Sequence, residues 1–159
     1  MTFIIDGYNL LWAVQKLSER SELLNDVQLC RIVGHYLKIV GEKGQIVFDG
    51  IGPPDKSGFY NINNLEIIFA GRDVEADTVI EDKINASTAP KSLTIVSSDR
   101  ELRDLAHKRK AVSLKSDEFW TDVHKQLTRK AKIREPQGKF RGISEGETDQ
   151  WLKIFGLEQ

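Results

Sequence analysis

Apolar residues in the first 115 positions of the chain come in short uninterrupted runs, and longer amphipathic segments separate these runs. Runs of four to six residues that are rich in Ile, Val, Leu and Phe are typical of strands buried on both faces. The pattern therefore predicts five strands, at residues 2–6, 45–49, 65–70, 93–97 and 111–114.

The segments between these runs have the spacing of helices. The clearest one carries apolar residues at positions 23, 24, 27, 30, 33, 36, 37 and 40, and it ends at Gly41 and Gly44. Asp73 is expected to cap a helix over residues 74–87, and Ser98 and Glu101 to form a capping box for a helix over 99–110. Further helices are predicted over residues 10–16 and from Ser116 onward.

Strands that alternate with helices predict an α/β domain with a parallel sheet covered on both faces. The domain is expected to span residues 1–134. Residues 135–159 begin as a basic linker rich in Pro and Gly, followed by a short helix from about Thr148 that carries Trp151 and Phe155. This helix is expected to dock its aromatic face on the domain, and a partner-binding element is the alternative.

Composition narrows the class of protein. Hydrophobic residues make up 40% and charged residues 30% of the chain, which is ordinary for a soluble protein and argues against disorder and against a membrane protein. The N-terminal apolar run is too short for a signal peptide, so we expect a cytoplasmic location. Cys30 is the single cysteine, which excludes an internal disulfide and makes a disulfide-linked partner or a thiolate metal site unexpected.

Charge is distributed unevenly along the chain. Residues 100–141 hold thirteen Lys and Arg against six Asp and Glu, whereas the rest of the chain holds ten against eighteen. A concentrated positive surface is typical of proteins that bind a polyanion. The alternative is a solvated helix face without a partner.

Four aspartates share one predicted location. Asp6 and Asp49 end the first two strands, Asp99 follows the fourth strand, and Asp77 lies early in the helix after the third. Ligands of parallel sheets bind beyond the carboxyl ends of the strands, so these carboxylates are expected to converge. Converging carboxylates repel one another unless cations neutralise them, and Mg²⁺ or Mn²⁺ prefers such oxygen ligands. Turn formation and helix capping are the alternative roles for each aspartate taken singly.

Four motifs carry a resemblance to a known family: IIDGYNLL, IVFDG, FAGRDVEADTVIEDKI and TIVSSDRELRDLA. In this order and spacing, over roughly residues 2–134, they resemble the YacP-like NYN branch of the PIN-like nucleases. The resemblance implies a three-layer α/β/α fold with strand order 3-2-1-4-5, and divalent-metal-dependent cleavage of RNA. It implies an acidic metal site at Asp6, Asp77 and Asp99, with Asn9 as the NYN asparagine and Asp49 as a further acid at the edge of the site.

Roles can also be assigned to other residues, on less specific grounds. Asp104 matches a position that is acidic in some PIN-like enzymes, so it is a candidate to support the metal ligands. Arg72 and Arg100 either contact phosphate or pair with the carboxylates. Tyr8 and Trp12 are candidates for stacking on a base, although a place in the core is the expected one for Trp12. RNA-backbone contacts are assigned to the basic segment, at Lys108, Arg109, Lys130, Lys132 and Arg134.

The loop around Phe59 and Tyr60 is either a substrate lip or an ordinary loop. A phosphatase of the haloacid dehalogenase type also places Asp after its first strand, but it needs a second Asp at position 8, where this chain has Tyr.

The functional expectation is a metal-dependent endoribonuclease that cuts single-stranded RNA, with messenger RNA on the ribosome as a candidate substrate. A bound Mg²⁺ or Mn²⁺ would activate the attacking water and stabilise charge on the scissile phosphate. The alternative is a non-catalytic RNA-binding module of the same fold.

Overall fold

The computed structural model describes residues 1–17 and 24–134. The chain divides into two compact units, Met1–Trp120 and Thr121–Gln159. Helix α5 (Ser116–Arg134) begins in the first unit and continues into the second. The predicted C-terminal linker and helix at 135–159 lie outside the described residues, so the division at residue 134 stays a prediction.

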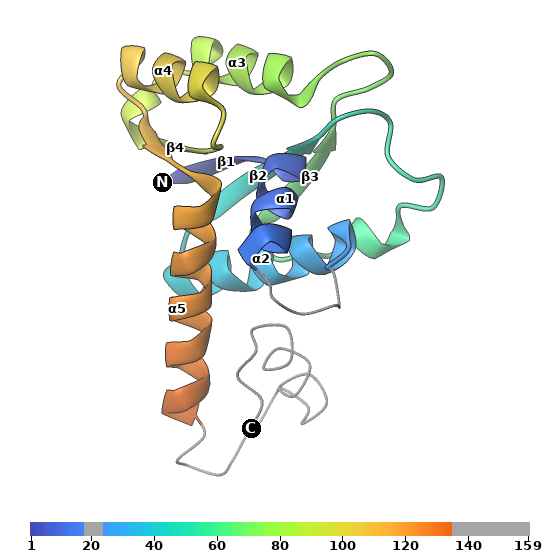
Figure 1. Cartoon of the computed structure of the whole chain (residues 1–159), viewed down its shortest axis with the longest axis vertical. Helices are drawn as coiled ribbons and strands as arrows, with labels where there is room; N and C mark the ends of the chain where they lie inside the picture. Colours follow the sequence, from blue (N-terminus) through green and yellow to red (C-terminus); the bar gives the residue numbers. More distant parts are fainter. Residues whose placement is uncertain (18–23, 135–159) are drawn as a thin grey trace. The chain divides into compact units, whose positions relative to one another are not determined.

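A five-stranded parallel sheet forms the centre of the first unit (Figure 1). Its order is β3-β2-β1-β4-β5, which confirms the predicted fold class and strand order. β1 lies in the middle, with Asp6 paired to Val47 of β2 and Ile5 paired to Val96 of β4. The strands are β1 (Thr2–Asp6), β2 (Lys43–Phe48), β3 (Leu65–Phe69), β4 (Leu93–Val96) and β5 (Val112–Leu114).

The helices between the strands cover both faces of the sheet. They are α1 (Gly7–Leu17), α2 (Asp26–Val40), α3 (Ala76–Ala86) and α4 (Arg100–Lys108), with two 3-10 turns at Ser57–Phe59 and Pro90–Ser92, and α5 follows β5. Asn25 and Gln28 form the capping box that starts α2, and Gly41 ends that helix in a left-handed conformation with φ of 72°. Within the described residues, no helix is long and apolar enough to cross a membrane.

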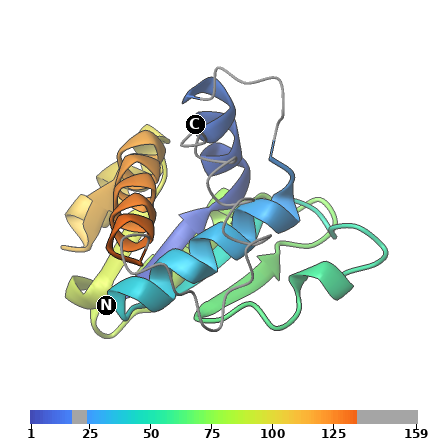
Figure 2. The same ribbon diagram turned by 90° about the horizontal axis from the view of Figure 1, so that it is seen from below.

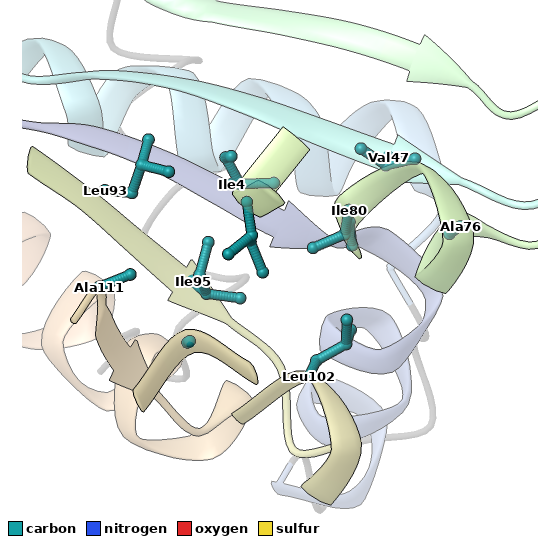
Figure 3. Close-up of a cluster of buried hydrophobic side chains, with 10 residues drawn as sticks. Ile4, Val47, Ala76, Ile80, Leu93, Ile95, Leu102 and Ala111 are labelled. Atoms are coloured by element: carbon teal, nitrogen blue, oxygen red, sulfur yellow. The ribbon is translucent and has the colours of Figure 1, made fainter. Parts of the chain in front are cut away.

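The core has one layer on each face of the sheet. On one face, α3 and α4 pack on alternate residues of β1, β2 and β4, with Ile4, Val47 and Ile95 against Ile80 and Leu102 (Figure 3). The opposite face is covered by α1 and α2 (Figure 2).

Aromatic side chains fill much of this second layer. The ring of Phe3 lies 6.4 Å from Tyr36 and 5.7 Å from Phe119. Gly7 is required at the start of α1, because an added Cβ would lie 2.5 Å from the ring of Phe48.

Three local expectations from the sequence are wrong. Trp12 is 65% exposed, because Leu11 and Val14 face the sheet and leave position 12 on the outer side of α1. Asp73 does not cap α3: the helix begins at Ala76, and Asp73 lies before it in a left-handed conformation with φ of 59°.

The third concerns the start of α4. Its N-cap is Asp99, whose side chain accepts a hydrogen bond from the backbone N–H of Glu101. Ser98 does not cap the helix because its hydroxyl accepts a hydrogen bond from the backbone N–H of Ser116 instead.

Candidate active site

The four predicted aspartates lie where the central strands end. Asp6 is the last residue of β1, and Asp49 directly follows β2. Asp99 caps α4 just after β4, and Asp77 is the second residue of α3. The parallel arrangement of β1, β2 and β4 therefore brings these side chains to one edge of the sheet.

Asp6 is a buried carboxyl group, only 7% exposed. The hydroxyl of Ser97 donates a hydrogen bond to its Oδ2 at 3.1 Å, and the backbone N–H of Asn9 donates another to the carboxylate. Burial raises the pKa of Asp6 to about 6. The hydrogen bonds oppose this rise, and the negative charges of Asp77 and Asp49 add to it, so Asp6 lies within the electrostatic reach of both.

Asp77 and Asp99 form a close pair of carboxyl groups. Burial raises the pKa of Asp77 to about 6, and the next largest cause is the negative charge of Asp99. A protonated Asp77 can share a hydrogen bond with Asp99, while the charges of Glu75 and Asp49 add further repulsion. Two acids held this close indicate a place where positive charge would be stabilised.

Ser97 connects two of these acids. Besides donating to Asp6, its hydroxyl accepts a hydrogen bond from the backbone N–H of Asp99 at 3.0 Å. Since Ser97 is completely buried, the Asp6 carboxylate and the start of α4 are held in a fixed relation.

Asn9 has its amide orientation determined by its neighbours. Its Oδ1 accepts hydrogen bonds from the backbone N–H of Ser98 at 2.9 Å and from the hydroxyl of Ser116 at 2.6 Å. A backbone N–H can only donate, so the atom that faces it has to be the oxygen. The Nδ2 group has no acceptor among the described residues.

Asp49 makes a different kind of contact. Its Oδ1 accepts a hydrogen bond from the backbone N–H of Ala76, the first residue of α3, at 2.6 Å. Asp49 is thereby linked to the helix that carries Asp77.

The other predicted residues lie outside this group of contacts. Asp104 is exposed on α4, two positions from the buried Leu102 and Ala106, so its side chain leaves the helix on the side opposite the sheet. Arg72 and Arg100 are exposed, and neither has a carboxylate within ion-pair distance in the described parts of the chain.

The predicted basic residues occupy α4 and α5. Lys108 and Arg109 are exposed at the end of α4, where Arg109 donates a hydrogen bond to the carbonyl of Asn85 at 3.3 Å. Lys130 is exposed on α5, and Lys132 and Arg134 belong to the end of that helix, in the second unit.

Three aromatic residues considered in the sequence analysis have defined surroundings. The Tyr8 ring lies edge-on to Phe48 at 5.1 Å and is half-buried. In the predicted lip, Phe59 is buried against the Phe69 ring at 5.3 Å, whereas the neighbouring Tyr60 is 68% exposed. Phe59 thus anchors the loop and Tyr60 is presented to solvent.

Sequence reasoning missed the three serines that organise the site. From sequence, Ser98 is expected only to cap the following helix, and Ser97 is assigned no role. Ser116 is 107 positions from Asn9 and has no sequence signal of its own.

The donor chemistry of the site fits a hard divalent cation, because Asp6, Asp77 and Asp99 offer only carboxylate oxygens and the charges of Asp6 and Asp99 are each unfavourable beside that of Asp77. Among the described residues, no group of three or more His, Cys, Asp or Glu side chains stands in position to hold a metal ion. The three-aspartate metal site therefore stays a prediction.

Comparison with known proteins gives the family. The model of the YacP-like NYN domain matches residues 3–153, nearly the whole chain. The protein belongs to the YacP-like NYN domain family. A comparison with curated proteins found no match.

Solved structures share the fold of this YacP-like NYN domain. The crystal structure of Rae1 (YacP) from Bacillus subtilis is similar with a TM-score of 0.67 and 20% identity, covering 98% of this chain and 92% of that chain. Its W164L mutant gives a TM-score of 0.64 and 17% identity, with 97% and 91% covered. The family and the fold together place the chain among the NYN and PIN-like nucleases.

Proposed function

We propose that this YacP-like NYN domain is a divalent-metal-dependent endoribonuclease that hydrolyses phosphodiester bonds within single-stranded RNA. Its proposed setting is the cytoplasm, with messenger RNA on the ribosome as substrate. The observation that supports this most strongly is the position of Asp6, Asp77 and Asp99 at the carboxyl edge of the sheet, where Asp77 lies within electrostatic reach of Asp6 and of Asp99.

Asp6, Asp77 and Asp99 are the proposed holders of Mg²⁺ or Mn²⁺. When bound, the ion supplies an activated water and neutralises charge on the phosphate. The chain itself positions the carboxylates: Ser97 holds Asp6, and the N-cap bond to Glu101 holds Asp99. Asn9 is proposed to donate from Nδ2 to a phosphate oxygen, because its Oδ1 is already occupied.

The reaction is hydrolysis. Water adds to the phosphorus of an internal phosphodiester, and the bond from phosphorus to the leaving ribose oxygen breaks. The elements of water are then divided between the phosphate and the freed hydroxyl. The three histidines lie on three different helices, and Cys30 is fully buried with a raised thiol pKa, so neither residue type favours a protein nucleophile over an attacking water.

Two groups of basic residues are proposed to contact the RNA backbone. One group lies on α5 and at the end of α4, and the other is near the aspartates in sequence. Together these are Arg72, Arg100, Lys108, Arg109, Lys130, Lys132 and Arg134. Arg72 and Arg100 lie close to the acidic positions in sequence, and neither forms an ion pair within the described residues, which favours phosphate contact over pairing with the carboxylates.

The test is RNA cleavage by the wild type and by Asp77→Asn, with Asp82→Asn as the matched control. Both aspartates are on α3, and Asp82 is exposed and outside the acidic group. Asp77→Asn is expected to lose most of the Mn²⁺-dependent cleavage, and Asp82→Asn to retain it. Equal cleavage by all three preparations would indicate a contaminating ribonuclease and would remove the support for this function.

The absence of a three-ligand group among the described side chains favours one alternative, a non-catalytic RNA-binding module. That function predicts RNA binding without cleavage, with or without Mn²⁺ and on free or ribosome-bound RNA. Cleavage that chelation abolishes and Mn²⁺ restores excludes it.

A further inference from the structure

Helix α3 lacks a cap from its own chain neighbours. The residue at its N-cap position is Glu75, and the Glu75 side chain makes no capping hydrogen bond. Free N–H groups in the first turn of a helix normally find an acceptor. Here the acceptor for Ala76 comes from a residue 27 positions earlier in sequence, Asp49, with an N–O distance of 2.6 Å.

The backbone on both sides of Asp49 is tied to the segment that leads into α3. The N–H of Ala70 donates to the carbonyl of Phe48 at 2.9 Å, and the N–H of Gly71 donates to the carbonyl of Gly50 at 2.9 Å. Gly50 and Gly71 also form an isolated antiparallel bridge. These bonds hold Asp49 at the start of α3, so its contact with Ala76 is built into the pairing of β2 with β3.

We propose that Asp49 is a positioning residue that caps α3 from the end of β2 and thereby holds Asp77 beside Asp99. In this role Asp49 acts through its hydrogen-bond acceptor and not as a ligand of the metal. The proposal rests on the proposed function only for the consequence at Asp77, since the capping contact itself belongs to the fold.

Substitutions at Asp49 can separate the effect of its hydrogen-bond acceptor from the effect of its negative charge. Asp49→Asn keeps an acceptor oxygen and loses the charge, and Asn is as good an N-cap as Asp. Asp49→Ala loses both. Glu75→Gln is the matched control, because Glu75 also places a negative charge near Asp77 but makes no capping bond. It therefore measures the effect of removing a neighbouring charge alone.

Two measurements read out the two parts of the proposal. Hydrogen exchange of the Ala76 amide, with chelator present, reports the cap without any metal or RNA. The rise in melting temperature on Mn²⁺ titration reports ion binding. Asp49→Asn is expected to keep amide protection and to match Glu75→Gln in Mn²⁺ affinity. Asp49→Ala is expected to lose protection and to weaken Mn²⁺ binding about tenfold or more, as removal of a ligand-orienting partner typically does.

Each result that differs from these expectations has a specific interpretation. Asp49→Asn that binds Mn²⁺ as weakly as Asp49→Ala, with Glu75→Gln unaffected, assigns the charge of Asp49 a ligand role and overturns the proposal. Unchanged Ala76 exchange in Asp49→Ala overturns it as well. If Asp49→Ala does not fold, the comparison of Asp49→Asn with Glu75→Gln still decides. A wild type that neither binds Mn²⁺ nor cuts RNA refutes the proposed function, and the exchange measurement still tests the cap.

Discussion

The hydroxyl of Ser116 donates a 2.6 Å hydrogen bond to Oδ1 of Asn9, joining the first turn of α5 to the first turn of α1. Ser116 is completely buried, and its backbone N–H also donates to the hydroxyl of Ser98. The backbone N–H of Ser98 in turn donates to the same Asn9 oxygen. Three segments distant in sequence therefore meet at one amide, and its Nδ2 has no acceptor in the part of the chain that the structure describes.

Ser116→Ala is expected to lower the free energy of unfolding by about 1 kcal/mol, because it removes one buried hydrogen bond and leaves Asn9 with a single donor. Ser113→Ala is the matched control. Among the described residues, the Ser113 hydroxyl is buried without a hydrogen-bond partner, so its removal is expected to cost nothing or to stabilise. Urea denaturation measures both variants, and equal losses would mean that the Asn9 contact contributes no stability.

Stability in chelator is expected to depend on pH through Asp6. Its pKa is raised from 3.8 to about 6 in the folded chain, so between these values the folded state binds more protons than the unfolded state. The stability present below about pH 4 is therefore lost as pH rises through 6. For Asp6 the loss is on the order of 3 kcal/mol. The raised pKa of Asp77 acts in the same direction.

Asp6→Asn removes the titrating group, so the variant is expected to lose less stability than the wild type between pH 4 and 7. Urea denaturation with chelator at several pH values gives this difference directly. A wild type and variant with parallel pH profiles would show that Asp6 is ionised in the folded state as readily as in the unfolded chain.

Mg²⁺ or Mn²⁺ is expected to raise the melting temperature, because an ion that binds only the folded state stabilises it by about 2.7 kcal/mol at a hundredfold excess over Kd. Asp99→Asn is expected to reduce this gain. It should leave α4 capped, because Asn can accept the hydrogen bond from Glu101 as Asp99 does. Thermal unfolding with and without the ion measures the effect. Glu101→Gln serves as the control, since Glu101 takes part in this cap through its backbone N–H.

RNA affinity is expected to fall as salt increases, because each phosphate contact releases counterions. Reversing Lys130, Lys132 and Arg134 together to Glu is expected to weaken binding. It should also reduce the slope of log affinity against log salt by about 0.7 for each phosphate of single-stranded RNA that the variant no longer neutralises. Mn²⁺ binding should be unchanged, which separates weaker RNA binding from a failure to fold. An unaltered slope would assign these charges to a solvated helix face.

The sequence alone predicted the framework of this protein well. Runs rich in apolar residues located all five strands to within two residues, since the strands of a parallel sheet covered on both faces are mostly apolar. The alternation of strands and helices predicted the parallel sheet, and the position of Asp6, Asp49 and Asp99 after strands predicted that they meet at one edge. The family motifs supplied the strand order, which the structure confirms.

Only the tertiary structure decided how the polar groups are used. Asp49 accepts a hydrogen bond from the first amide of α3, and Ser97 links Asp6 to Asp99. Ser98 accepts a hydrogen bond from Ser116 and does not cap α4. These contacts depend on strand pairing that brings together groups up to 107 positions apart. The spacing of apolar residues indicates which face of a helix or strand is buried. A side-chain hydrogen bond depends in addition on where another helix or strand ends. Local sequence therefore determines the strands and helices, and their register determines the partners of each polar side chain.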